Sequence, residues 1–146
     1  MKETDFKTSF VNHLKKTLHR LNLDYDIKKI ESPIVRGIAD INFNIDSVPG
    51  WIETKYLKEW PKRQTTRVKF HRYTEQQYNF LMHRGKLGEK TFLIARIEND
   101  IVISQYPYIW CPDVKYTKEN IENTFFEIYP IYKFDYEKFI ININTE

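Results

Sequence analysis

The chain opens with apolar residues spaced as on one face of a helix. Phe6, Phe10, Leu14, Leu18 and Leu21 follow one another at intervals of four, four, four and three residues. Because an α-helix has about 3.6 residues per turn, these side chains share one stripe. We therefore predict an amphipathic helix over residues 4–22.

Alternation of apolar and polar residues then predicts three β-strands. The first covers residues 25–30 and ends near Pro33, and the second covers residues 38–45. Val48-Pro49-Gly50 has the chemistry of a turn and leads into a third strand over residues 51–56. So short a connection predicts that the second and third strands pair antiparallel.

Residues 58–73 show no clean period and are rich in Arg, Lys and Thr, so we predict an irregular excursion. Thr74 has the position of an N-cap, with Gln77 as its capping-box partner, which predicts a helix through about Arg84 that Gly85 and Gly88 end.

The rest of the chain predicts a hairpin and two short helices. Residues 91–97 and 101–104 are apolar runs separated by a turn, and residues 117–126 and 135–143 are the two helical segments. The order of helix, strands, helix, strands predicts an α/β fold with a small mixed sheet flanked by helices. We expect one domain over residues 1–146, with a core at about 3–104 and an aromatic-rich extension at 105–146 that packs on the sheet or forms a dimer surface.

Composition narrows the class of protein. Hydrophobic residues make up 41% and charged residues 29% of the 146 positions, as in ordinary globular proteins. Cys111 is the only cysteine, so one chain can hold neither a disulfide framework nor a cysteine zinc site. No apolar run approaches the roughly 18 residues that span a bilayer, so we expect no membrane partner and a cytoplasmic location.

Positive charge gathers in the middle of the chain. From Lys55 to Lys90 ten Lys and Arg residues face three Glu residues, an excess of seven. Such a cluster fits a polyanion such as DNA, although a solvated surface would have the same composition. Trp60 and Tyr73 lie in this segment and could stack on unpaired bases, but aromatic residues in loops more often anchor the loop on the core.

Asp40, Glu53 and Lys55 are the residues that point to chemistry. Glu53 and Lys55 are two apart in a predicted strand and therefore share a face. Antiparallel pairing would bring Asp40 within a few ångströms of Glu53. Two carboxylates suit Mg²⁺, which prefers oxygen ligands and can hold a water against a phosphodiester. Lys55 could orient that attacking water, stabilise the departing oxygen, or act as a base. A Glu-x-Lys triplet alone would be read as an exposed charge ladder; Asp40, Gly37 and the basic flank favour a site.

These motifs, taken in order, resemble the PD-(D/E)XK nuclease superfamily. The matching segments are Arg36-Gly37-Ile38-Ala39-Asp40-Ile41, Gly50-Trp51-Ile52-Glu53-Thr54-Lys55, and Thr74-Glu75-Gln76-Gln77-Tyr78-Asn79-Phe80-Leu81 followed by Gly85. Within the superfamily the chain looks most like the Holliday-junction resolvases and the virus-type replication-repair (VRR-NUC) nucleases. The similarity covers about residues 3–97. Ala39 stands where the family usually has proline, and the connection between Lys55 and the glutamine helix is unusually long.

The resemblance implies a restriction-endonuclease-like αβββαβ core and assigns roles to residues. Asp40, Glu53 and the Thr54 backbone carbonyl would bind the metal, Lys55 would be the catalytic lysine, and Gln77 would face the site. Many relatives carry a glutamate on the first helix, for which Glu3 is the candidate unless Thr4 or Asp5 caps that helix.

The sequence thus predicts a Mg²⁺- or Mn²⁺-dependent endo- or exodeoxyribonuclease that selects DNA structure, branched or single-stranded, over sequence. Relatives that cleave junctions tend to be dimers, so a homodimer is an open option, and a viral origin would place the protein in host cytoplasm. The alternative is a catalytically silent nuclease fold that binds DNA or protein. The cations predicted to hold the DNA backbone are Lys58, Lys62, Arg63, Arg67, Lys69 and Arg72.

Overall fold

A six-stranded mixed sheet forms the centre of the protein in the computed structural model, which describes residues 1–31 and 37–145. The strands lie side by side in chain order, and all neighbours are antiparallel except β3 and β4, which are parallel. The strands are β1 (Tyr25–Lys29), β2 (Ile41–Ile45), β3 (Val48–Leu57), β4 (Lys90–Ile97), β5 (Asp100–Gln105) and β6 (Glu127–Pro130).

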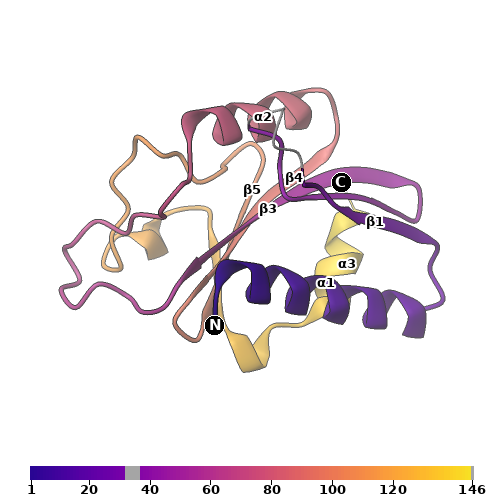
Figure 1. Cartoon of the computed structure of the whole chain (residues 1–146), viewed down its shortest axis with the longest axis horizontal. Helices are drawn as coiled ribbons and strands as arrows, with labels where there is room; N and C mark the ends of the chain where they lie inside the picture. The colour runs from indigo at the N-terminus through magenta and orange to yellow at the C-terminus, as the bar shows by residue number, and fades with distance from the viewer. Residues whose placement is uncertain (32–36, 146) are drawn as a thin grey trace.

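Three α-helices cover the sheet. They are α1 (Glu3–Arg20), α2 (Glu75–Lys86) and α3 (Tyr136–Ile143). Figure 1 shows α2 on one side of the sheet and α1 with α3 on the other. Since parallel neighbours need a crossover connection, α2 lies in the segment that carries the chain from β3 back to β4. Two short 3₁₀ helices, η1 (Ile121–Asn123) and η2 (Ile131–Lys133), flank β6.

Each face of the sheet has its own hydrophobic core. On the α1 side, Phe10 and Leu14 of the predicted stripe pack with Phe139 of α3 against Ile52 and other sheet residues. On the α2 side, Leu81 packs with Leu93 of β4 and Trp110. The alternation along β3 follows from this, because Ile52 faces the first core while its neighbours in the chain face the other side.

The predicted α/β class, with a mixed sheet flanked by helices, is confirmed. The elements from α1 to β4 follow one another in the order αβββαβ. The prediction of an N-cap at Thr74 is also confirmed, since the Thr74 hydroxyl accepts from the Gln77 N–H and the Gln77 side-chain carbonyl accepts from the Thr74 N–H. The segment after residue 105 packs on the core as one alternative proposed: Trp110 is buried on one face of the sheet and Phe139 on the other.

Several predicted boundaries are wrong. The turn lies at Asp46 and Ser47, and Val48-Pro49-Gly50 belongs to β3. The second strand begins at Ile41, so residues 38–40 are outside it. Gly85 lies inside α2 and does not end it. The predicted strand end near Pro33, and Arg36 of the matching motif, lie outside the described residues.

The predicted helix over residues 117–126 is also wrong, and β6 was missed. Thr117 and Asn120 hydrogen-bond each other as in a helix start, but only the 3₁₀ turn η1 follows. The Thr124 hydroxyl then donates to the Ile121 carbonyl, 2.5 Å away, and accepts from the Phe126 N–H. Such side chains compete with the backbone for helical hydrogen bonds, so the turn ends here.

Among the described residues, no helix has the length and apolar character needed to cross a membrane.

Gly85 provides a test of the packing between α2 and the segment after β5. Alanine normally stabilises a helix by about 1 kcal/mol relative to glycine. At this position an added Cβ would lie 2.3 Å from Cγ and 2.8 Å from Cβ of Tyr106. We therefore expect Gly85→Ala to lower the free energy of unfolding by about 1–2 kcal/mol in urea denaturation, since overpacking outweighs helix propensity. In a Tyr106→Gly background, which removes both of these Tyr106 atoms, the same change should be neutral or stabilising. Stabilisation in the wild-type background would contradict this packing.

Candidate metal centre

The site lies at the start of β2. The pairing of β2 with β3 ends at Ile41 opposite Ile52, and Asp40 is the next residue beyond that pair. From Glu53 to Leu57, β3 continues beside β4. Within the described residues this stretch of β3 has no strand partner on its other edge. Asp40 and the start of α1 occupy the space beside that edge, so the topology brings distant carboxylates together.

Asp40 is held to β3 by two hydrogen bonds. Its Oδ2 accepts from the Thr54 N–H at 3.1 Å and from the Thr54 hydroxyl at 3.0 Å. In a strand the N–H and C=O of one residue point to the same edge. The Thr54 carbonyl therefore also points to the edge where Asp40 lies, which is the direction that its predicted role as a metal ligand requires.

Glu53 is a carboxylate buried in the middle of the protein. It is 1% exposed, and its Oε1 has no hydrogen-bond partner among the described residues. Its Oε2 lies 3.3 Å from Lys55 Nζ and 3.5 Å from Gln77 Nε2. A buried carboxylate oxygen without a partner is costly, so this atom has room for a cation or another donor.

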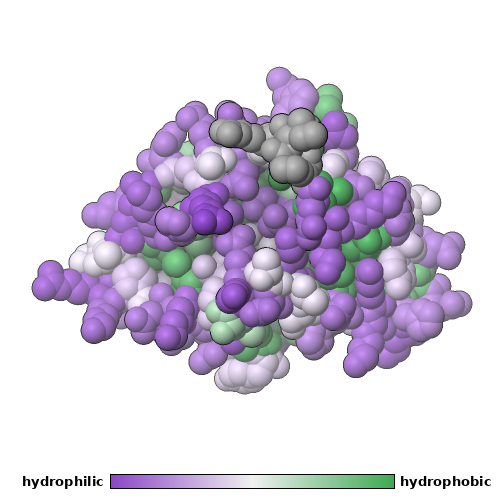
Figure 2. Space-filling view, viewed as in Figure 1, coloured by the Kyte–Doolittle hydropathy of each residue, from purple (hydrophilic) through white to green (hydrophobic). Residues whose placement is uncertain are grey.

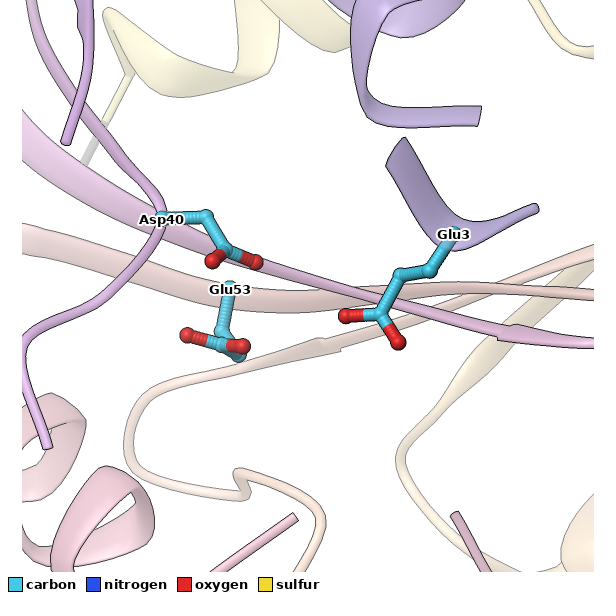
Figure 3. Close-up of side chains that lie close together, drawn as sticks. All are labelled: Glu3, Asp40 and Glu53. Atoms are coloured by element: carbon cyan, nitrogen blue, oxygen red, sulfur yellow. The ribbon is translucent and has the colours of Figure 1, made fainter. Parts of the chain in front are cut away.

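Glu3 completes a group of three carboxylates. It is the first residue of α1, after Lys2 as N-cap, and Asp5 accepts from the Lys2 N–H instead of capping the helix itself. One carboxylate oxygen each from Glu3, Asp40 and Glu53 lies within 4.8 Å of the other two. Figure 3 shows the three side chains converging from α1, from the residue before β2 and from β3. Glu3 therefore lies beside Asp40 and Glu53, as predicted for the glutamate of the first helix.

Lys55 supplies the positive charge at the centre of this group. It is 2% exposed, and its Nζ lies 3.6 Å from Glu3 Oε1 in addition to the contact with Glu53. Nζ also donates to the Arg72 carbonyl at 3.4 Å and lies 5.8 Å from the centre of the Tyr73 ring. The lysine is thus fixed by groups from three separate parts of the chain.

Burial governs the titration of the two glutamates. Loss of solvent raises the pKa of Glu53 well above its ordinary range, and the nearby Asp40 carboxylate raises this pKa further while Lys55 lowers it. Burial likewise raises the pKa of Glu3, and the ammonium of Lys55 opposes that shift. In both cases one lysine offsets only part of the cost of bringing carboxylates together.

Gly37 and the start of α2 shape the approach to the site. Gly37 has φ +86°, a conformation that favours glycine, and a Cβ there would lie 3.0 Å from Cβ of Gln76. The absence of a side chain at Gly37 therefore allows the backbone ahead of β2 to approach α2 closely. Gln77, the next residue, faces Glu53 while its side-chain carbonyl caps the helix.

The basic segment, residues 58–72, leaves β3 just beyond Lys55 and returns to it. Val68 and Phe70 are buried and anchor it, while residues 62–67 and Lys69 face solvent. All six predicted DNA-contacting cations are exposed, and none forms an ion pair within the described part of the chain. Arg67 also donates to the Pro112 carbonyl. Hydrophilic side chains predominate on the face drawn in Figure 2, with smaller hydrophobic areas between them.

Trp60 and Tyr73 serve as anchors of this segment. Trp60 is 6% exposed and its Nε1 donates to Asp100, while the Tyr73 hydroxyl donates to the Trp110 carbonyl. Burial raises the pKa of Tyr73, and the Glu53 carboxylate adds to this effect. These aromatic side chains hold the basic segment against the core, as the alternative interpretation of the sequence expected.

Sequence reasoning missed three features of the site. Lys7 Nζ lies 4.0 Å from Asp40 Oδ1, one helical turn after Glu3, and the i to i+4 spacing could have indicated it. The Thr54 hydroxyl was overlooked because alternation places it on the opposite face from Glu53. The contact of the Arg72 carbonyl with Lys55 has no sequence signal, since any residue can supply a carbonyl.

Comparison with known proteins gives no family for the chain. No model of a protein family matches it, and no curated protein sequence matches it. The function is therefore inferred from the site itself.

Thr54 tests how Asp40 is oriented. Thr54→Val keeps the shape and the backbone N–H but removes the hydroxyl that donates to Asp40. In this variant we expect the Mn²⁺-dependent rise in melting temperature to require about tenfold more metal. The reason is that a lost hydrogen bond to a charged group such as Asp40 costs about 1.5 kcal/mol. Thr54→Ser, which keeps the hydroxyl, should retain most of the affinity. Equal metal dependence in Thr54→Val and the wild type would show that the Thr54 hydroxyl does not orient Asp40 for metal binding.

The raised pKa of Glu53 predicts a dependence of stability on pH in the metal-free protein. An unfolded glutamate titrates at about pH 4.3, whereas the folded group holds its proton to higher pH. At this residue the folded state therefore binds more protons over this window, and the contribution of Glu53 to wild-type stability falls as the pH rises from about 4.3 through the folded pKa. Glu53→Gln should remove this loss.

Urea denaturation in EDTA between about pH 4.5 and 8 measures the difference directly. We expect Glu53→Gln to gain stability relative to wild type as the pH increases. Exposed Glu122, changed to Gln, is the matched control and should show no such trend. A difference that stays constant with pH would contradict the raised pKa.

Proposed function

We propose that the protein is a Mg²⁺- or Mn²⁺-dependent nuclease that hydrolyses DNA phosphodiesters. The observation that carries this proposal is the convergence of Glu3, Asp40 and Glu53 within 4.8 Å, together with a buried Glu53 oxygen that has no hydrogen-bond partner among the described residues. A buried lysine lies against the same carboxylates. The order of motifs that resembles PD-(D/E)XK nucleases supports the same assignment.

The donor atoms fit a hard cation. Carboxylate and carbonyl oxygens are the ligands that Mg²⁺ and Mn²⁺ prefer. Asp40, Glu53 and the Thr54 carbonyl would bind the ion, and Glu3 is positioned to join them directly or through water. When bound, the ion supplies positive charge against the phosphate and acidifies an attacking water.

Lys55 and Gln77 supply hydrogen-bond donors beside the proposed metal ligands. Lys55 is held by Glu53, Glu3 and the Arg72 carbonyl, so its ammonium is already directed at the place where a phosphate would meet the carboxylates. A fixed cation stabilises negative charge that develops on phosphate oxygens without further rearrangement. Gln77 restrains the Glu53 carboxylate from the start of α2.

The basic segment provides the contacts with DNA. Its exposed cations run from Lys58 to Arg72, and the carbonyl of Arg72 touches Lys55. Phosphate contacts position a nucleic acid without reading its sequence, so we expect selection by DNA structure. The salt dependence of binding should reflect these cations.

Cleavage by matched variants tests the proposal. Labelled linear, flap, four-way-junction and single-stranded DNA would be incubated with Mg²⁺, Mn²⁺ or EDTA. We expect metal-dependent cleavage by the wild type and a loss of at least about a hundredfold in Glu53→Gln and in Lys55→Met. The first removes a carboxylate proposed to bind the metal, and the second removes the ammonium that would stabilise charge on the phosphate. Binding of DNA should largely survive.

Glu122→Gln and Lys115→Met are the controls, because both residues are exposed and lie outside the proposed site. They should cleave like the wild type. Cleavage at the wild-type rate by Glu53→Gln and Lys55→Met would exclude this site. DNA binding without cleavage of any substrate would favour a protein that only binds.

A further inference from the structure

An exposed pair of stacked aromatic rings stands apart from the packed aromatic residues. Tyr108 and Phe125 lie with ring centres 4.0 Å apart and an angle of 19° between the planes. Phe125 is 74% exposed and Tyr108 is 51% exposed. Since one face of each ring covers the other, the outer face of Phe125 remains open to solvent.

The neighbouring aromatic side chains are used differently. Trp110 is 2% exposed and stacks on Phe126 at 5.3 Å, and Tyr116 packs against both. This buried group accounts for the hydrophobic packing of residues 106–126. Neither Tyr108 nor Phe125 belongs to the two hydrophobic cores, and two adjacent exposed aromatic rings form a candidate interaction surface.

The pair is carried by a segment that lies along the basic segment. Residues 58–74 and 106–126 run side by side in Figure 1, and Arg67 forms a β-bridge with Thr117. The Val68 N–H donates to the Tyr116 carbonyl and the Glu119 N–H to the Gln64 carbonyl.

A second link runs toward the candidate metal centre. The Trp110 carbonyl accepts from the Tyr73 hydroxyl at 2.7 Å, and the Tyr73 ring lies beside Lys55. Trp110 is two residues from Tyr108, a chain distance of at most about 7.6 Å. A strand bound at Lys55 and on the basic segment would therefore need only a few nucleotides to reach the aromatic pair.

We propose that the outer face of Phe125, supported by Tyr108, stacks with an unpaired base of the DNA strand whose backbone lies on the basic segment. This inference rests on the proposed function and names its substrate class as DNA with a single-stranded portion. Base stacking on an aromatic ring needs a flat, open π-face, which a paired base inside a duplex does not offer.

The charge of the segment that carries the pair favours a base over a phosphate at this position. Residues 106–126 carry three acidic side chains and two basic ones, which are Asp113, Glu119, Glu122, Lys115 and Lys118. This segment therefore has no excess of positive charge for a phosphate. The cations are on the adjacent segment, so the backbone would be held there while the base turns toward Phe125.

Binding measured without cleavage tests this proposal independently of catalysis. Fluorescence anisotropy in EDTA would give the Kd of a single-stranded oligonucleotide and of a blunt duplex. We expect Phe125→Leu, which keeps an apolar side chain but removes the flat ring, to weaken single-strand binding by about 5- to 150-fold. The loss of affinity should be several-fold larger for single-stranded than for duplex DNA. Phe125→Trp, which keeps a flat ring, should bind single-stranded DNA about as tightly as the wild type.

Lys62→Ala is the matched control in the basic segment and should weaken binding of both DNA forms by similar factors. Equal losses for both forms in Phe125→Leu, or no loss, would overturn the stacking role. A change in sedimentation showing that Phe125→Leu abolishes self-association would instead assign the pair to a contact between chains. Single-strand binding that depends on Phe125, without any cleavage, would support the stacking role and refute the nuclease. Cleavage together with binding that does not depend on Phe125 would support the nuclease and refute the stacking role.

Discussion

The burial of Glu53 and Lys55 within the sheet is the constraint around which the site is built. Both side chains are almost without solvent, and their ion pair at 3.3 Å leaves one carboxylate oxygen unmatched. Removing charges from water is costly unless each finds partners, so the surroundings must supply them. Gln77, Glu3 and the Arg72 carbonyl do this from α2, α1 and the basic segment. An arrangement that gathers more negative than positive charge in a buried place is suited to a cation.

The same constraint explains the opening in the sheet. If β2 continued beside β3, its backbone would fill the edge next to Glu53 and Thr54. Instead β2 begins only at Ile41, and Thr54 uses both its N–H and its hydroxyl to hold the carboxylate of the preceding Asp40. The hydrogen bonds that a further pair of strand residues would have made are partly replaced by bonds to a side chain. The basic segment then returns from its excursion through Arg72, a non-glycine residue at φ +68°, and its carbonyl reaches Lys55.

Local patterns predicted much of this arrangement because local physics determines it. The apolar stripe from Phe6 to Leu18 and the cap at Thr74 depend on residues close in sequence, and both were predicted correctly. Strand parity alone placed Glu53 and Lys55 on one face. The turn at Asp46 and Ser47 escaped notice because both adopt positive φ, +50° and +68°, without the glycine that usually marks such a turn. β6 and the contact of the Arg72 carbonyl with Lys55 depend on tertiary packing, which sequence spacing does not encode.

The most direct test of the central claim is to locate the metal. A crystal soaked in Mn²⁺ and measured for anomalous scattering would show where the ion binds. The account predicts a peak bounded by the carboxylates of Asp40 and Glu53 and the Thr54 carbonyl, with Glu3 nearby. An intact site that shows no peak there, or Mn²⁺ bound only at other surface carboxylates, would contradict it.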